Sequence, residues 1–273
     1  MKTKIGIIGL GLIGGSLLKK LREFDEFELF AVSGSEKTQK TLKKLGITVG
    51  SSLEIVKPCR VVFVCSPISN TLEVLDKLEG VVSPKTIVSD VASVKEFVGK
   101  KKRPYKLIGG HPMAGTEKQG FENSFKELFE GAKWVLCPFC NYEKKDVELL
   151  KSIVEKTGAT VIEADAKKHD YAAALISHMP LIISQAIFES AKDNELALIL
   201  ASSGFRDMTR LACSNLGMAK DMVKYNKANI EKAFDTFASS LNTLTDNYSG
   251  QIEEIKSLRE KMYSKDGKNI FKS

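Results

Sequence analysis

The chain has little histidine, an odd number of cysteines and no apolar run of clear membrane-spanning length. Its 273 residues include only three histidines and five cysteines. An odd cysteine count without a recognisable export signal argues for free thiols rather than a disulfide framework. The apolar run over 5–18 could pass for a signal peptide, but five glycines interrupt it and charged residues follow it. We therefore expect a cytoplasmic protein.

Neither a membrane nor a nucleic acid is expected as a partner. The longest later apolar stretch, 172–188, contains polar residues such as Ser177 and His178, and we predict that it is too short and too polar to cross a bilayer. The net charge of +7 would suit an anionic ligand, nucleic acid or an acidic membrane surface. However, the lysines are spread along the chain, and the one dense run, KKKR at 100–103, is typical of a solvated loop.

The sequence CPFC at 137–140 admits two interpretations. C-x-x-C between a strand and a helix is a thiol–disulfide signature, and KWVL before it predicts a strand. The next helix is expected to begin later, with Asn141 as its cap, and the motif stands far along the chain, so we favour a role without redox chemistry. No second pair of cysteines or histidines completes four zinc ligands, and no metal site is expected.

Short apolar runs alternate with amphipathic ones through the first 165 residues. The runs that predict strands are KIGIIG, ELFAVS, RVVFVC, TIVSDV, YKLIGG, KWVLCP and ATVIEA. They are continuous rather than alternating, as in strands buried on both faces. The alternation predicts an α/β fold, with a doubly wound parallel-sheet Rossmann domain over 1–165. Helical patterns alone follow, predicting an all-helical domain over 166–248, kinked at Pro180, and a C-terminal helix and loose tail over 249–273.

The first predicted strand runs into a glycine-rich turn, and a helix follows. The spacing G-x-G-x-x-G is met by Gly9, Gly11 and Gly14. These glycines permit a tight turn, the approach of a pyrophosphate and close helix–strand packing, while the helix N-terminus offers unpaired N–H groups. The predicted cofactor contacts here are Gly9, Gly11, Leu12, Ile13 and Gly14, joined by Ser66 and Pro67 after the third predicted strand.

The end of the second predicted strand bears on which dinucleotide binds. An NAD site usually places a carboxylate there to hold the ribose 2′-OH. Here the strand ends at Ser33, and no carboxylate stands where it would repel a 2′-phosphate. Ser33, Ser35 and Lys37 could hold that phosphate, although Glu36 would oppose it if turned inward. The pattern favours NADP over NAD.

Further motifs appear in a fixed order along the chain. They are SDVASVK (89–95), GGHPMAGTEKQGF (109–121), HDYAAALISHMP (169–180) and SSGFRDMTR (202–210). Together with GLGLIGGS they resemble the prephenate/arogenate dehydrogenase family of tyrosine biosynthesis, in its monofunctional form. The resemblance implies oxidative decarboxylation of prephenate or arogenate with hydride transfer to NAD(P), giving 4-hydroxyphenylpyruvate or tyrosine.

The resemblance also implies a catalytic pair. His111 would accept the proton of the ring hydroxyl as a neutral imidazole. Ser93 would hydrogen-bond near the same hydroxyl and orient the histidine. From the residues alone Ser93 is equally a helix N-cap, and both roles can hold together. The glycines before His111 are expected to bring the backbone close to the cofactor.

Substrate binding is implied for the helical domain. Arg210 would grip a carboxylate of the dicarboxylate substrate bidentately, although without the resemblance it would be an exposed helix residue. The other implied substrate positions are His169, Ser177, His178 and Asp207, and Asp207 would either pair with an arginine or gate the site. From the residues alone, His169 would face solvent and His178 would be buried and satisfied.

Two departures and two rival functions stay open at this point. Leu181 stands where many prephenate-using members have histidine, and Ala219 stands where tryptophan is frequent, so prephenate and arogenate are both retained. The resemblance also implies a homodimer formed through the helical domain. The alternatives are another two-domain Rossmann reductase with a lysine base, or a non-catalytic NADP-binding sensor with no need of His111.

Overall fold

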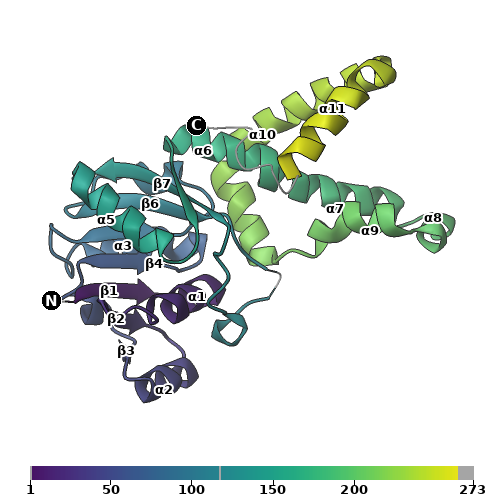
Figure 1. Ribbon diagram of the computed structural model, residues 1–273. Coiled ribbons are helices and arrows are strands. Elements are labelled where there is room, and N and C mark those ends of the chain that lie inside the picture. Colours follow the sequence, from purple (N-terminus) through teal and green to yellow (C-terminus); the bar gives the residue numbers. More distant parts are fainter. Residues whose placement is uncertain (1, 117, 264–273) are drawn as a thin grey trace.

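The computed structural model describes residues 2–116 and 118–263, and it shows a sheet sandwiched by helices and joined to a helical domain (Figure 1). The eight-stranded sheet has the order β3-β2-β1-β4-β5-β6-β7-β8. Its strands are β1 (Thr3–Ile8), β2 (Phe27–Val32), β3 (Thr48–Gly50), β4 (Val61–Val64), β5 (Ile87–Asp90), β6 (Lys106–Pro112), β7 (Lys133–Cys140) and β8 (Thr160–Glu163). Every pairing is parallel except β6 with β7, which confirms the predicted α/β class as a mostly parallel sheet.

Helices cover both faces of this sheet. They are α1 (Leu12–Leu21), α2 (Glu36–Lys44), α3 (Ile68–Leu78), α4 (Glu96–Gly99) and α5 (Lys144–Glu155), with 3₁₀ turns at η1 (Leu53–Val56) and η2 (Phe121–Asn123). One apolar core includes Leu17 of α1 and Leu150 of α5, and the other includes Leu75 of α3. Strands buried between two helical layers explain the continuous apolar runs in the sequence.

Three local features of strands and caps differ from the predictions. The sequence did not predict β3, which is only three residues long. CPFC lies inside β7, not after it, because β7 extends to Cys140. Asn141 does not cap the next helix: it takes a left-handed turn conformation, with a φ of 57°, and Glu143 caps α5 through a capping box. Burial raises the pKa of the Cys137 thiol to about 12, which disfavours the thiolate that redox chemistry would need.

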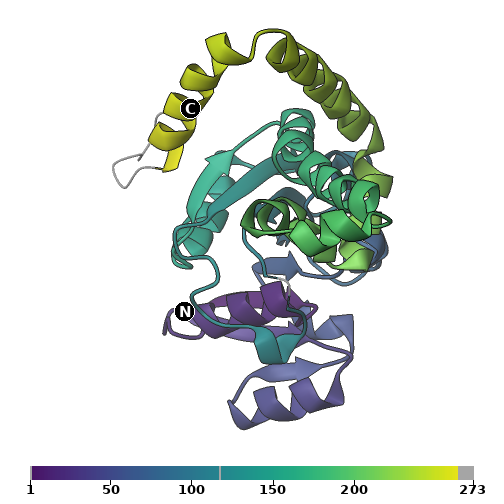
Figure 2. The ribbon, with the colours of Figure 1, turned by 90° about the vertical axis from the view of Figure 1, so that its right-hand side faces the viewer.

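Two residues separate the last strand of the sheet from the first helix of the helical domain. It comprises α6 (Ala166–Ala173), the π-helical turn η3 (Ala174–His178), α7 (Met179–Ala191), α8 (Glu195–Leu200), α9 (Ser203–Thr209), the 3₁₀ turn η4 (Arg210–Cys213), α10 (Leu216–Asp246) and α11 (Tyr248–Tyr263). The C-terminal part of α10 extends together with α11 as an arm beyond the rest of the chain (Figure 2). The domain boundaries at 165 and 248 stay predictions, and the loose end expected over 264–273 lies outside the described residues.

One long helix joins the two domains. Helix α6, the turn η3 and α7 form a continuous helical run of 26 residues, Ala166–Ala191, which contains an 18-residue stretch of mean hydropathy 1.5, so by length and composition it could cross a membrane. By these two criteria, the expectation that this segment is too short and too polar to cross a bilayer was wrong. The π-helical turn ends at His178, two residues before Pro180, where we expected a kink. Because the run carries buried His169 and Asp170 against the sheet domain, and buried His178 against Asn226, we assign its apolar surface to protein packing.

Candidate active site

The turn between β1 and α1 has the backbone geometry that a dinucleotide site requires. Gly9 has a φ of 87°, a conformation that residues with a side chain rarely adopt. A Cβ at Gly14 would collide with the carbonyl oxygen of Gly9, whereas a Cβ at Gly11 would meet no atom within 4 Å. The turn is therefore tightly packed at Gly14 and open at Gly11, beside the N-terminus of α1. These residues fit a pyrophosphate.

The other predicted contacts of the dinucleotide border the same turn. Leu12 and Ile13 form the first turn of α1. A Cβ at Gly9 would overlap with the backbone after β4, and the next residues there are Ser66 and Pro67, which precede α3. The cofactor roles of these residues stay predictions, but the fold brings the two segments together.

The glycine geometry yields a matched pair of predictions. Gly14→Ala should destabilise the cofactor-free protein by about 1–3 kcal/mol, because the added methyl group overpacks a closed site. Gly11→Ala should leave that stability nearly unchanged but weaken NADP⁺ binding by about tenfold or more, because the methyl group would occupy the space of a pyrophosphate. Thermal unfolding and cofactor titration measure the two effects. Wild-type binding by Gly11→Ala would show that no pyrophosphate lies there.

The predicted 2′-phosphate contacts surround the start of α2. Ser33 is buried, and its Oγ accepts a hydrogen bond from the backbone N–H of Ser35 at 3.2 Å. Ser35 caps α2, accepting from Thr38 N at 3.3 Å, so its hydroxyl is already partly engaged. Glu36 and Lys37 are both exposed. The N-terminus of α2 therefore adds a helix dipole that favours an anion at the end of β2.

His111 lies within a strand instead of following one. It belongs to β6 and pairs with Val135 of the antiparallel strand β7. The glycine before it is required by packing: a Cβ at Gly110 would overlap with the carbonyl oxygen of Asp90 and the indole nitrogen of Trp134. Packing within the sheet thus explains Gly110, and the close approach of this backbone to the cofactor stays a prediction.

His111 contacts the helical domain through a second histidine. His111 Nδ1 lies 2.9 Å from His169 Nε2, and the two rings meet edge to face. His169 is buried, which overturns its interpretation as a solvent-facing residue. Burial lowers the pKa of His111 well below 6.5, and electrostatic interactions with His169, Lys95 and His178, which would repel a second positive charge there, lower it further. His111 is therefore neutral at pH 7, as a base must be.

Ser93 lies in a loop held by a buried ion pair. Lys95 is fully buried, its Nζ pairs with Asp90, and it also donates to the carbonyl of Gly110 at 2.6 Å. Ser93 is not the N-cap of the following helix, because α4 begins only at Glu96. Its Oγ is buried, and among the described residues it has no hydrogen-bond partner. A buried hydroxyl without a partner is what a polar ligand would satisfy.

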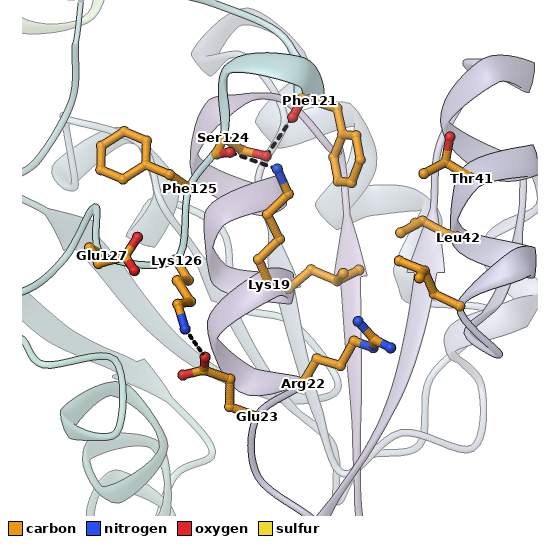
Figure 3. A pocket seen from close by; sticks show the side chains of 12 residues that line it. Lys19, Arg22, Glu23, Thr41, Leu42, Phe121, Ser124, Phe125, Lys126 and Glu127 are labelled. Atoms are coloured by element: carbon orange, nitrogen blue, oxygen red, sulfur yellow. Dashed lines mark hydrogen bonds and ion pairs between the residues drawn. The ribbon is translucent and has the colours of Figure 1, made fainter.

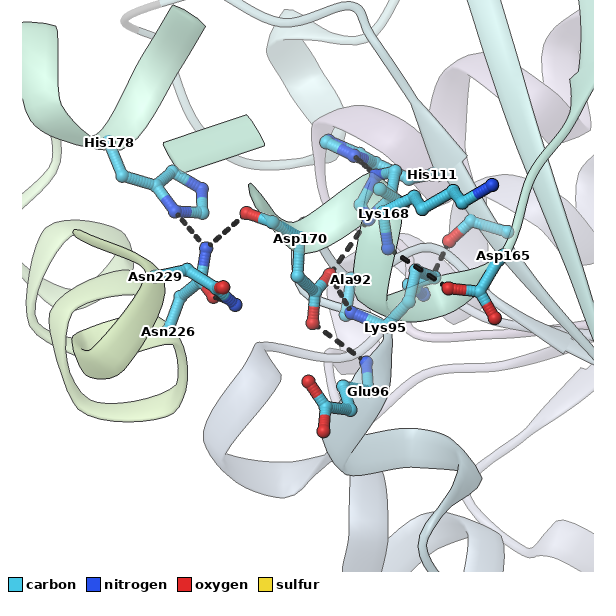
Figure 4. A network of polar contacts seen from close by, with 12 residues as sticks. Ala92, Lys95, Glu96, His111, Asp165, Lys168, Asp170, His178, Asn226 and Asn229 are labelled. Carbon is cyan, nitrogen blue, oxygen red and sulfur yellow. Dashed lines mark hydrogen bonds and ion pairs between the residues drawn. The ribbon is translucent and has the colours of Figure 1, made fainter. Parts of the chain in front are cut away.

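His178 presents a similar unpaired group. Its Nδ1 lies 3.0 Å from the side-chain amide of Asn226, which can only donate, so the neutral ring carries its proton on Nε2 (Figure 4). That Nε2 is buried and has no partner in the described parts of the chain. Burial lowers the pKa of His178 to about 4. His178 is therefore buried, as predicted, but only half satisfied.

The remaining substrate residues are not gathered around His111. Arg210 opens η4, is exposed and makes no hydrogen bond or ion pair with the described residues. Asp207 is exposed and pairs with Arg206 at 3.3 Å, the pairing with an arginine that we had considered. Ser177 lies in the π-helical turn beside His178 and is half-buried.

Sequence reasoning missed four polar residues of this region. They are Asp90, Lys95, Asp170 and Asn226, all buried. Asp90 and Lys95 stand inside SDVASVK, and Asp170 follows His169, so motif membership could have indicated them. Asn226 had no sequence signal: it interrupts α10 with non-helical φ and ψ and donates to the backbone carbonyl of Asp170 at 2.8 Å.

A separate cavity of about 650 Å³ lies between α1, α2 and the segment 121–127 (Figure 3). None of the predicted site residues lines it. Its basic side chains are largely engaged: Lys19 donates to the carbonyl of Ser124 at 2.6 Å, and Lys126 pairs with Glu23. We therefore do not assign this cavity to the active site.

Both domains of the chain match domains of the same known family. Residues 20–163 match the prephenate dehydrogenase nucleotide-binding domain, and residues 165–265 match the prephenate dehydrogenase dimerization domain. The chain belongs to the prephenate dehydrogenase family. It is an NAD(P)-dependent prephenate/arogenate dehydrogenase, as its motifs predicted, which decides against the sensor and the hydroxyacid-type reductase.

Individual relatives agree with this assignment. The chain is 30% identical to the prephenate dehydrogenase of Bacillus subtilis, over 100% of this chain and 73% of that protein. The crystal structure of Synechocystis arogenate dehydrogenase is 34% identical, with a TM-score of 0.81 over 95% of this chain and 97% of that one. Prephenate dehydrogenase from Aquifex aeolicus, in complex with hydroxyphenyl propionate and NAD⁺, is 30% identical, with a TM-score of 0.81 over 95% and 96% of the two chains.

The match to a dimerization domain implies a homodimer. Its surface is consistent with that assembly, because large apolar side chains are exposed on several of its helices. Among them are Leu196, Ile199, Leu200, Met208 and Leu216, each more than half exposed.

Proposed function

We propose that this dehydrogenase oxidises the ring hydroxyl of prephenate or arogenate at the junction of its two domains, with His111 as the base. The observation that carries the proposal is the set of unsatisfied polar groups there. His111 is neutral, and its Nε2 receives no hydrogen bond from the described residues. Ser93 Oγ and His178 Nε2 are buried without partners. Together they offer hydrogen-bonding groups to a substrate hydroxyl and its neighbouring polar atoms.

The chemistry follows from these groups. His111 takes the hydroxyl proton as the ring carbon is oxidised, and Ser93 orients the hydroxyl toward it. The bound nicotinamide dinucleotide supplies the hydride acceptor. Loss of carbon dioxide restores the aromatic ring, and the imidazolium of His111 can return its proton to the phenolate oxygen. We further propose that Arg210 holds a substrate carboxylate, with His169, Ser177 and Asp207 supporting the substrate side.

Turnover assays with both substrates and both cofactors test this function. We expect measurable oxidation of prephenate or arogenate, with carbon dioxide released in step with reduced cofactor. Many prephenate-using members have a histidine at the position of Leu181. In this chain the leucine is buried in the core of the sheet domain and offers the substrate no imidazole. Failure to turn over either substrate would contradict the proposal. Cytoplasmic location stays a prediction.

We propose that NADP is preferred to NAD. The support is the absence of a carboxylate at the end of β2 and the N-terminus of α2 beside Ser33. Ser33→Asp should lower the ratio of kcat/KM for NADP over NAD by about tenfold or more, because its charge repels a 2′-phosphate and accepts from a 2′-OH. Ser33→Ala is the matched control, since it removes the hydroxyl without adding charge. A wild-type preference for NAD would refute the proposal; the Aquifex aeolicus relative was crystallised with NAD⁺.

A further inference from the structure

A chain of hydrogen bonds connects His111 to the start of helix α4. His111 Nδ1 lies 2.9 Å from His169 Nε2, and His169 Nδ1 lies 2.8 Å from Asp170 Oδ1. The carboxylate of Asp170 also accepts from the backbone N–H groups of Lys95 at 2.7 Å and Glu96 at 2.8 Å (Figure 4). Asp170 is 1% exposed, so these contacts are shielded from water. This series of hydrogen bonds therefore runs from His111 in the sheet domain to α6 of the helical domain and back to α4 of the sheet domain.

The donors in this chain determine where each proton lies. Both backbone N–H groups can only donate, so Asp170 acts as an acceptor on both oxygens, the behaviour of an ionised carboxylate. His169 therefore donates from Nδ1 to Asp170. A neutral His169 then has a lone pair on Nε2, and it can only accept from His111 Nδ1. The proton of neutral His111 must accordingly lie on Nδ1, which leaves a lone pair on Nε2.

We propose that Asp170, acting through His169, is a positioning residue that fixes the tautomer of His111 and makes Nε2 its basic nitrogen. The inference rests on the proposed function of His111 as the base, and it explains why Nε2 and not Nδ1 accepts the proton. The negative charge of Asp170 also opposes the cost of forming an imidazolium on His111 in a buried site. Because α6 belongs to the helical domain, the correct tautomer depends on the docking of that domain against α4.

The same reasoning separates His178 from the pair. Asn226 donates to its Nδ1, so the proton of His178 lies on Nε2, opposite to the arrangement in His111 and His169. The chain has only three histidines, and each should therefore show a defined tautomer in the folded protein. This pattern is a direct spectroscopic signature, and it does not depend on catalysis.

Long-range ¹H–¹⁵N spectra of the full chain labelled at its histidine rings test the tautomers, with and without NADP⁺. Single substitutions of each histidine assign the three rings. We expect His111 and His169 protonated on Nδ1 and His178 protonated on Nε2 at neutral pH. A His111 protonated on Nε2 would overturn the inference, even if His111 proved essential for turnover. The expected tautomers together with normal turnover of His111→Asn would instead refute the proposed base and leave the tautomer assignment standing.

Kinetics test whether Asp170 acts through His111. Asp170→Ala should lower kcat by about 10²–10⁴-fold, the range seen when a catalytic histidine loses the carboxylate that sets its tautomer. In a His111→Asn background the same change should lower kcat little further, because the residues act as a unit. A full additional loss in the double variant would show a structural role and refute the inference.

Two further variants control for folding. Asp165→Asn alters the cap of the same helix, where Asp165 accepts from Lys168 N at 3.0 Å, and it should leave kcat near the wild-type value. Asp170→Asn retains the shape of the carboxylate, and its His111 tautomer can be read from the same spectra. Should Asp170→Ala fail to fold, the spectra of the wild-type chain and of Asp170→Asn still decide the inference.

Discussion

Replacing His111 with asparagine is expected to lower kcat by about 10²–10⁴-fold, the usual contribution of a positioned general base. Asparagine is smaller than histidine and can still donate a hydrogen bond to His169, but it cannot accept a proton near neutral pH. Cofactor affinity should change little, because the glycine-rich turn belongs to β1 and α1. Steady-state kinetics and cofactor titration give the two values, and thermal unfolding shows whether the variant folds. Near-normal turnover would remove His111 from the mechanism.

The pH dependence of activity follows from the same group. His111 must be neutral to accept a proton, so activity falls as the pH drops through its pKa. Because burial lowers that pKa well below 6.5, the acid limb of kcat/KM should lie below 6.5, lower than for a histidine in water. The charged and titratable groups that face His111 are Lys95 and Asp90 of the sheet domain and His169, Asp170 and His178 of the helical domain. An acid limb above 6.5 would contradict this environment.

Replacing Arg210 with alanine is expected to weaken substrate binding by about 2–5 kcal/mol, if the guanidinium makes a desolvated pair with a carboxylate. The loss should appear mainly as a raised KM, because the arginine would hold the ground state and the transition state alike. Arg210→Lys should restore only part of the affinity, since an ammonium group cannot make the bidentate contact. Stability should change little, because Arg210 is exposed and unpaired among the described residues.

Arg206 provides a matched control for this prediction. It stands four residues earlier, is exposed and pairs with Asp207 at 3.3 Å. Arg206→Ala should leave KM for the cyclohexadienol substrate nearly unchanged, and neither variant should affect cofactor affinity. If Arg210→Ala leaves KM unchanged while Arg206→Ala raises it, Arg206 is the residue that holds the carboxylate.

The sequence determined the features that depend on local geometry. Gly9 and Gly14 are required by a positive φ and by close packing within one turn, and both constraints act between residues a few positions apart. The buried strands and the change to helices near 166 follow from hydrophobic periodicity, which is also local. The motif series indicated the family, and His111 and Ser93 were identified because they stand inside specific motifs.

The tertiary structure decided what depends on partners distant in the chain. His169 and Asp170 lie on a polar helical segment whose pattern suggests a solvated face, yet docking against β6 and α4 buries both. Ser93 seemed a suitable cap by position, but the N-terminal N–H groups of α4 are satisfied by Asp170 from the other domain. Asn226 donates a hydrogen bond to His178 from a point where the helical geometry of α10 is interrupted. Burial and hydrogen-bond direction arise from these long-range contacts, so only the folded chain could define the tautomer of its base.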